Sequence, residues 1–213
     1  MKKLLLAVCL TAATTVATYA QKSFEGSVKY SITYGDMPEE MKQYESMLPK
    51  EMVMKIKGDK SRMEQNSAMG SNITITDDKA KKVTVLVNMM GQKVAIEQNL
   101  ENNEEEKMPE IKYLDETKKI AGYTCKKAEI SHPDMDETMT VYYTDEIVGT
   151  KTNAQFKGLN GFLMEYSMSN QGMEMTITAS EVKETKISNA EFTIPDDYEK
   201  MTQEEFQKKM GGQ

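Results

Sequence analysis

The stretch Phe24-Glu25-Gly26-Ser27-Val28-Lys29-Tyr30-Ser31-Ile32-Thr33-Tyr34 decides the fold class of this chain. Aromatic, aliphatic or glycine residues occupy its even positions, and charged or hydroxyl residues occupy the odd positions between them. Side chains of a β-strand alternate between two faces, whereas a helix would spread these residues around its axis. The pattern therefore predicts a strand with one buried face and one solvated face.

Similar alternation predicts further strands at residues 52–57, 61–65, 72–76, 83–88, 93–98, 119–131, 138–144, 162–169, 173–183 and 192–194. Short turn sequences connect several of them, such as Gly58-Asp59, Asp77-Asp78-Lys79-Ala80 and Asn170-Gln171-Gly172. Hairpins in series give neighbouring antiparallel strands, and a polar second face is typical of a sheet with one side in water.

Two helices interrupt this pattern. Asp36 and Glu39 have the spacing of a capping box, and Pro49 would end the helix that follows. The apolar stripe of that helix would consist of Met37, Met41, Tyr44 and Leu48. Near the carboxyl terminus, Thr202 and Glu205 form a second capping box, which predicts a short C-terminal helix.

The amino terminus has the features of a targeting segment. Two lysines precede an uncharged, largely apolar stretch at residues 4–16, and Thr18-Tyr19-Ala20 offers small residues to a signal peptidase. We therefore expect residues 1–20 to be a signal peptide cleaved after Ala20, which predicts an exported, periplasmic protein. A lipidated Cys9 is the alternative, although Val8 stands where a small residue is expected. Outer-membrane association or secretion stays open.

Removing those 20 residues from 213 leaves 193, a length that suits a single domain at residues 21–213. The formal net charge of the chain is -7, which argues against nucleic acid and anionic membranes as partners. No later segment has the length and apolar character of a transmembrane helix, so we do not expect an integral membrane protein.

Catalytic and metal-binding patterns are sparse. His132 is the only histidine, and no serine or cysteine forms a recognisable motif with it. We therefore expect no enzyme activity, no cofactor and no metal site. Cys125 would be the only cysteine of the mature chain; its neighbours Lys126 and Lys127 could activate the thiol, but its place in a strand pattern favours a small buried residue.

Methionine is unusually frequent, with 19 residues. Flexible, polarisable methionine side chains are common on apolar binding surfaces, but they also fill irregular cores. A Cu(I) thioether site at Met89-Met90 or Met173–Met175 is a third interpretation, although such sites usually include Cys or His.

Three segments resemble a known family. Residues 119–128 (KIAGYTCKKA), 157–162 (KGLNGF) and 192–198 (FTIPDDY) are similar, in order, to segments of GLPGLI-type envelope proteins of Gram-negative bacteria. Asn160 and Phe162 replace a proline and a leucine of the GLPGLI signature. These replacements indicate the related domain of unknown function, DUF4412-type, rather than GLPGLI proper.

The resemblance implies an α+β, mostly β fold like that of the lipoprotein carrier LolA. In this fold an open, strongly curved antiparallel sheet forms a half-barrel around an apolar cavity. A helix near residues 36–48 would cover the concave face, which otherwise stays exposed to water, and a short helix would end the chain.

Two functions follow from these expectations. The first is a periplasmic binding or carrier protein for an apolar ligand such as a lipid, an acyl chain or a lipoprotein anchor. The second is an envelope protein–protein interaction or stress-response module that acts through a sheet edge. For the first, the predicted cavity residues are Tyr30, Ile32, Met41, Tyr44, Leu48, Val85, Val87, Phe162, Met164, Tyr166, Met168, Met173, Met175 and Ile177.

Overall fold

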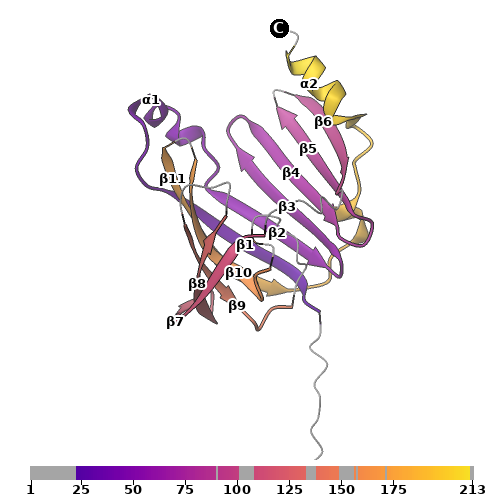
Figure 1. Cartoon of the computed structure of the whole chain (residues 1–213). Coiled ribbons are helices and arrows are strands. Elements are labelled where there is room, and N and C mark those ends of the chain that lie inside the picture. The colour runs from indigo at the N-terminus through magenta and orange to yellow at the C-terminus, as the bar shows by residue number, and fades with distance from the viewer. Residues whose placement is uncertain are drawn as a thin grey trace, which may run out of the picture.

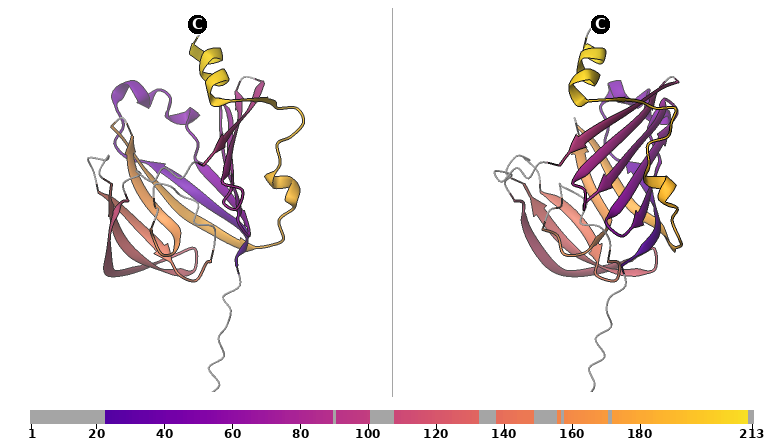
Figure 2. Two further views of the ribbon diagram at one scale, coloured as in Figure 1. Left: turned by 45° about the vertical axis from the view of Figure 1, so that its right-hand side comes forward. Right: turned by 90° about the vertical axis from the view of Figure 1, so that its right-hand side faces the viewer.

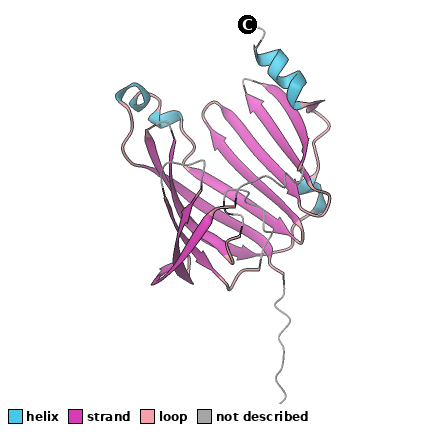
Figure 3. Ribbon diagram, in the orientation of Figure 1, coloured by secondary structure: helices cyan, strands magenta, loops and turns pink. Residues whose placement is uncertain are grey.

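The computed structural model describes residues 23–89, 91–100, 108–132, 138–148, 156, 158–170 and 172–211; the expected signal peptide lies outside them. Within these ranges twelve strands form one sheet, in the order β12-β6-β5-β4-β3-β2-β1-β11-β10-β9-β8-β7 (Figures 1 and 3). The strands are β1 Glu25–Tyr34, β2 Glu51–Lys57, β3 Lys60–Ser67, β4 Gly70–Asp77, β5 Lys82–Met89, β6 Gln92–Asn99, β7 Glu110–Ile120, β8 Tyr123–Ser131, β9 Met139–Thr144, β10 Phe162–Asn170, β11 Met173–Glu184 and β12 Glu199–Met201.

The predicted open, curved antiparallel sheet is confirmed. Neighbouring strands are antiparallel except for the edge strand β12, which pairs in parallel with β6. The sheet bends so that the wall of β3 to β6 faces the strands β7 to β10 (Figure 2). β1 is central, because it pairs with β2 on one side and with β11 on the other. Its buried and partly exposed residues alternate as predicted.

Two strand predictions were wrong. The pattern at 119–131 predicted one strand, but Ala121 (φ 47°) and Gly122 (φ 90°) form a turn between β7 and β8. The segment 192–194 was predicted to be a strand. Instead, Phe192 is the last residue of a 3-10 helix, η3 Asn189–Phe192, and residues 193 and 194 belong to no strand. The Ser188 side chain accepts a hydrogen bond from the Ala190 N–H and so caps that helix.

The helix predicted near residues 36–48 is shorter than expected. It consists of the single turn α1 Glu39–Lys42 and the 3-10 turn η1 Glu45–Met47. Pro38, and not Asp36, holds the position before α1, and no side chain caps it. The Asp36 carbonyl instead accepts the Glu174 N–H, which extends the pairing of β1 with β11. A proline also disfavours helical geometry in the residue before it, so a helix cannot readily begin at 36.

The C-terminal helix α2 Gln203–Gly211 begins as predicted. The Thr202 hydroxyl accepts the Glu205 N–H at 3.2 Å, and the Glu205 carboxylate accepts the Thr202 N–H at 2.8 Å. Phe206 packs against buried Met201, so the hydrophobic contact that often accompanies a capping box is present.

Hydrophobic packing occurs on both faces of the sheet. The larger buried cluster lies between β1, β2 and the strands β8 to β11. A second cluster lies on the opposite face, where residues 185–198, here called the strap, cover β4, β5 and β6 (Figure 2). Its members include Ile75 and Leu86 from the sheet and Ile187 and Phe192 from the strap.

Glu25 holds the start of the strap in place. Its carboxylate accepts the Ile187 N–H at 2.9 Å, while Lys57 donates to the Ile187 carbonyl at 2.6 Å. That backbone hydrogen bond, with a smaller contribution from Lys57, holds the pKa of the Glu25 carboxyl below its ordinary value. The folded-state pKa is therefore below the unfolded one, so the carboxylate stabilises the fold above about pH 4.3, and this stabilisation is lost as pH falls through the lower value.

We therefore expect the NMR shift of the Ile187 amide proton to titrate with a midpoint below the ordinary glutamate pKa of about 4.3. Glu25→Gln keeps an acceptor oxygen but removes the charge, and it should abolish that titration. A midpoint at or above the ordinary value would show that the Glu25 carboxylate does not anchor the strap.

Candidate functional site

The strand register defines one continuous face across β1 to β6, on the side of the sheet on which Tyr30 lies. We call this the inner face. Three rows of side chains cross it, because directly opposite residues in neighbouring strands share a face. The rows are Tyr30–Met52–Gln65–Asn72–Val87–Val94, Val28–Met54–Met63–Thr74–Val85–Ile96 and Gly26–Ile56–Ser61–Thr76–Val83–Gln98.

No position of these rows carries a charged side chain, although charged residues make up 29% of the sequence. The basic residues of β2 to β6 lie at other positions, and each is paired with a carboxylate. The pairs are Lys55–Glu191, Lys57–Glu25, Lys60–Asp77, Arg62–Glu64, Lys82–Glu97 and Lys93–Asp197. The three rows of the inner face therefore carry no net charge.

Part of the inner face is open. Val83, Val85 and Val87 on β5 are only half-buried, and they belong to none of the three buried clusters of the described residues. On the same strand, Leu86 points the other way and is fully buried under the strap. We call Val83, Val85 and Val87 the valine row; unlike the three rows that cross the sheet, it runs along a single strand, β5. These three side chains are apolar and accessible, as a site for an apolar ligand requires.

The structure divides the predicted cavity residues into three groups. The first is buried and contributes to the larger cluster: Tyr30, Ile32, Phe162, Met164, Tyr166 and Ile177. The second, Val85 and Val87, belongs to the valine row. The third lies near the end of the sheet at which β1 ends and β11 begins, and it consists of Met41, Tyr44, Leu48, Met168, Met173 and Met175.

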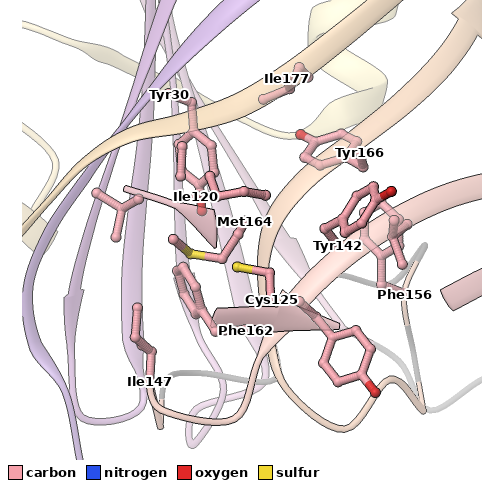
Figure 4. Close-up of a cluster of buried hydrophobic side chains, with 14 of the residues drawn as sticks. Tyr30, Ile120, Cys125, Tyr142, Ile147, Phe156, Phe162, Met164, Tyr166 and Ile177 are labelled. Carbon is pink, nitrogen blue, oxygen red and sulfur yellow. The ribbon is translucent and has the colours of Figure 1, made fainter. Parts of the chain in front are cut away.

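The first group is packed rather than hollow. Phe156 comes from the connection between β9 and β10, and its ring packs edge-on against Tyr166 with ring centroids 5.2 Å apart. The Tyr30 hydroxyl donates to the Leu163 carbonyl at 3.0 Å. Figure 4 shows Met164 between Phe162, Cys125 and Tyr30. Met164 has no exposed surface, and the side chains of this group act as core.

The sequence analysis missed four residues of the open part of the inner face, one of which is Val83 of the valine row itself. Met63, Thr74 and Asn72 lie directly beside the valine row or one strand further on, but they were not predicted as site residues. The signal that could have found them is the hairpin register, because the Asp77–Ala80 turn places Thr74 opposite Val85.

Methionines gather at one end of the sheet. The connections at the end where β1 meets β2 contain Met37, Met41, Met47 and Met69, while Met89 ends β5 and Met173 begins β11 there. Met69 and Met89 are about half exposed, at 50% and 49%. A cavity of about 280 Å³ at this end is lined by Gly35, Asp36, Met37, Lys42 and Glu45. The neutral inner face therefore opens toward a methionine-rich rim.

Other candidate chemistry is limited in the described part of the chain. Cys125 is buried, as its strand position predicted, and burial raises the pKa of its thiol. Among the described residues, no three His, Cys, Asp or Glu side chains gather as metal ligands would. In the same part of the chain, no helix has the length and apolar character needed to cross a bilayer. The Cu(I) thioether site stays a prediction, and Met90 lies outside the described residues.

Solved structures share this fold. Two crystal structures of PNGF-II, in space groups P21 and C2, match 89% and 85% of this chain with TM-scores of 0.56 and 0.53, at 15% and 16% sequence identity. The matches cover 34% and 31% of the PNGF-II chains, so this chain spans about a third of their length. An uncharacterised conserved protein from Thermus thermophilus matches 84% of this chain and 91% of its own at 12% identity and a TM-score of 0.48.

No curated protein sequence matches this chain. The resemblance to GLPGLI-type and DUF4412-type proteins stays a prediction. A family model described as "N-glycanase peptide, N-terminal domain" matches residues 28–205. This match covers most of the sequence and of the described sheet, and the chain therefore belongs to the PNGase F-II N-terminal domain family.

Proposed function

We propose that this protein binds an apolar ligand on the inner face of β3 to β6, as a non-catalytic binding or carrier protein. The single observation that carries the proposal is the valine row, which is apolar, partly exposed and outside the three buried clusters. An accessible apolar surface of this kind on a curved sheet is a typical ligand site.

The dimensions of the face suit an extended chain. From β3 to β6 there are three interstrand spacings of about 4.8 Å, so the face is roughly 14 Å wide. Met54 and Met63 lie at one side of the valine row, where they are partly buried against the larger cluster. Flexible methionines adapt to chains of different shape, which suits a carrier.

A non-catalytic role is consistent with the chemistry of this face. Its positions on β2 to β6 carry only aliphatic, thioether, hydroxyl and amide side chains. General acid–base and nucleophilic catalysis need titratable or activated groups within reach of the substrate. We extend the proposal to export to the periplasm, which rests on the features of residues 1–20.

Val87→Asp and Asn88→Asp test this function as a matched pair. The two residues are neighbours on β5, but Val87 faces inward and Asn88 faces outward. Val87→Asp should weaken binding of a neutral lipid at least about tenfold, because a ligand would have to bury the new carboxylate. Asn88→Asp should leave affinity unchanged. Native mass spectrometry and lipid titration measure both, and circular dichroism checks folding.

Equal affinity in the two variants would place the ligand elsewhere. Failure of any lipid to bind or to co-purify with the wild-type protein would remove the proposed function altogether.

A partner-binding role through a sheet edge is the second candidate. The observation that favours it is β7, an 11-residue strand at the end of the sheet order. Two features oppose it. The register shifts between Leu114 and Thr117, and Lys112 and Lys118 lie on the strand; bulges and edge lysines both discourage strand addition. Cross-linking in cells from β7, compared with β5, would decide between partner and ligand.

A further inference from the structure

We propose that the ligand of the inner face is uncharged along its whole length, including its head group: a neutral ester, amide or alcohol rather than a fatty acid or an anionic lipid. This inference rests on the proposed function and names its ligand class. It follows from two observations. The three rows of the inner face carry no charged side chain, and the basic side chains of β2 to β6 are already paired with carboxylates.

The three rows of the inner face offer no cation to an anionic head group. The lysines at the methionine-rich end, Lys42 and Lys50, lie in the connection before β2, where Lys42 pairs with Glu39. The nearest basic side chains along β3 and β4 are Lys60 and Arg62. Arg62 donates to the Glu191 carbonyl at 3.1 Å and pairs with Glu64 at 3.2 Å, and its side chain is only 12% exposed. Lys60 lies at the far end of the strand in an ion pair with Asp77 at 3.2 Å.

Releasing either cation would break contacts that hold the strap and the hairpin turn. The Arg62 side chain lies on the outer face, where it also contacts the Glu191 carboxylate of the strap. An ionised carboxylate on the inner face would thus be partly desolvated without a counter-ion, which is unfavourable by several kcal/mol in general. The net charge of the chain, -7, adds a long-range repulsion of anions.

Neutral polar groups are present where a head group would need them. Gln65 and Asn72 lie directly opposite each other on β3 and β4, in the row nearest the methionine-rich rim. Asn72 is exposed, and the Gln65 amide makes only a weak contact with the Met52 sulfur, at 3.7 Å. Amide N–H and C=O groups can hydrogen-bond an ester carbonyl or a hydroxyl without charge. The acyl chain would then run from this amide pair along the valine row.

The test compares methyl laurate with laurate at about pH 8, where the laurate carboxyl is ionised. The two probes share one acyl chain and differ in the charge of the head. Equilibrium dialysis against the full chain should give at least about tenfold tighter binding of the ester. Laurate binding as tightly as the ester, or more tightly, would overturn the neutral-head inference while leaving the apolar site in place. If neither probe binds, the proposed function fails and this inference fails with it.

A charge placed on the inner face should reverse the preference. Asn72→Lys adds a cation at an exposed inner position, and Ser71→Lys adds the same cation on the neighbouring outer position. Asn72→Lys should tighten laurate binding about tenfold and leave the ester unimproved, because the ammonium pairs with the carboxylate. Ser71→Lys should change neither affinity. Gln65→Lys serves as the second inner variant if Asn72→Lys fails to fold. Equal responses of inner and outer variants would contradict the proposed position of the head group.

Discussion

Met164→Glu is expected to unfold the protein or to leave it barely stable. Met164 has no exposed surface, and Figure 4 shows it between Phe162, Cys125 and Tyr30. A glutamate there would lose the packing of the thioether and would bury a carboxylate among the apolar side chains of the larger cluster. Substitutions that bury an unpaired charge are among the few that cost more than about 4 kcal/mol. Urea unfolding followed by circular dichroism measures the loss.

Met164→Leu is the matched control for that result. Leucine nearly conserves the volume of methionine and should cost less than about 1.5 kcal/mol. A folded Met164→Glu protein that loses only ligand affinity would contradict the core assignment and would return Met164 to the ligand site. The contrast with Val87→Asp is informative, because Val87 is half-buried and should tolerate a charge in the fold.

Alternation was enough to predict β1 and the face of β5 that carries Val85 and Val87, but it did not show why the other face of β5 carries a buried leucine. In β1 only one face is apolar, so the buried side follows directly from the sequence 24–34. β5 reads Lys-Val-Thr-Val-Leu-Val-Asn-Met, with apolar residues on both faces. The second face is apolar because the strap covers it, and the strap is separated from β5 by about half of the chain. No local pattern in β5 contains that information.

The same reason explains why a cavity was predicted where the structure has a core. Tyr166 and Ile177 do lie on an apolar face, as the pattern indicated. Phe156 fills the space next to them, and it comes from a connection with no strand or helix periodicity. Whether an apolar concavity is filled depends on such tertiary contacts, which periodicity does not report.

These two outcomes give the two halves of the sheet different roles. The half formed by β1 and β8 to β11 is closed by its own side chains and supplies most of the hydrophobic stabilisation. The half formed by β3 to β6 is packed on both faces: the strap covers its outer face, and Met201 and Phe206 pack against Val94 and Ile96 at the β6 side of its inner face. Because the strap and the β6 side supply this packing, the valine row of β5 and its neighbours Asn72 and Thr74 on β4 can remain accessible to a ligand without loss of the fold.

The seam between these halves is β1, and Gly26→Ala is expected to weaken it severely. Gly26 is buried and pairs with Ile56 of β2 and Glu184 of β11. A methyl group at this position would overlap the Lys183 carbonyl oxygen and would lie 2.7 Å from the Phe24 ring. The first of these is backbone of the paired strand, so relief requires β1 and β11 to separate locally. We expect a loss of about 3 kcal/mol, at the upper end of the usual cost of overpacking.

Gly35→Ala tests the same change just beyond the other end of β1. A methyl group there would lie 3.1 Å from a Glu174 carboxylate oxygen, which can rotate away, and 3.2 Å from the Glu174 Cβ, which would need only a small shift; no backbone atom of another residue lies as close as at Gly26. Because alanine also restricts the unfolded chain, this variant should be neutral or slightly stabilising, within about 1 kcal/mol. Urea unfolding of both variants separates steric overlap from a general effect of replacing glycine. A Gly26→Ala protein as stable as Gly35→Ala would mean that β1 and β11 can shift apart at little cost, and that the two halves of the sheet are less firmly joined than their pairing indicates.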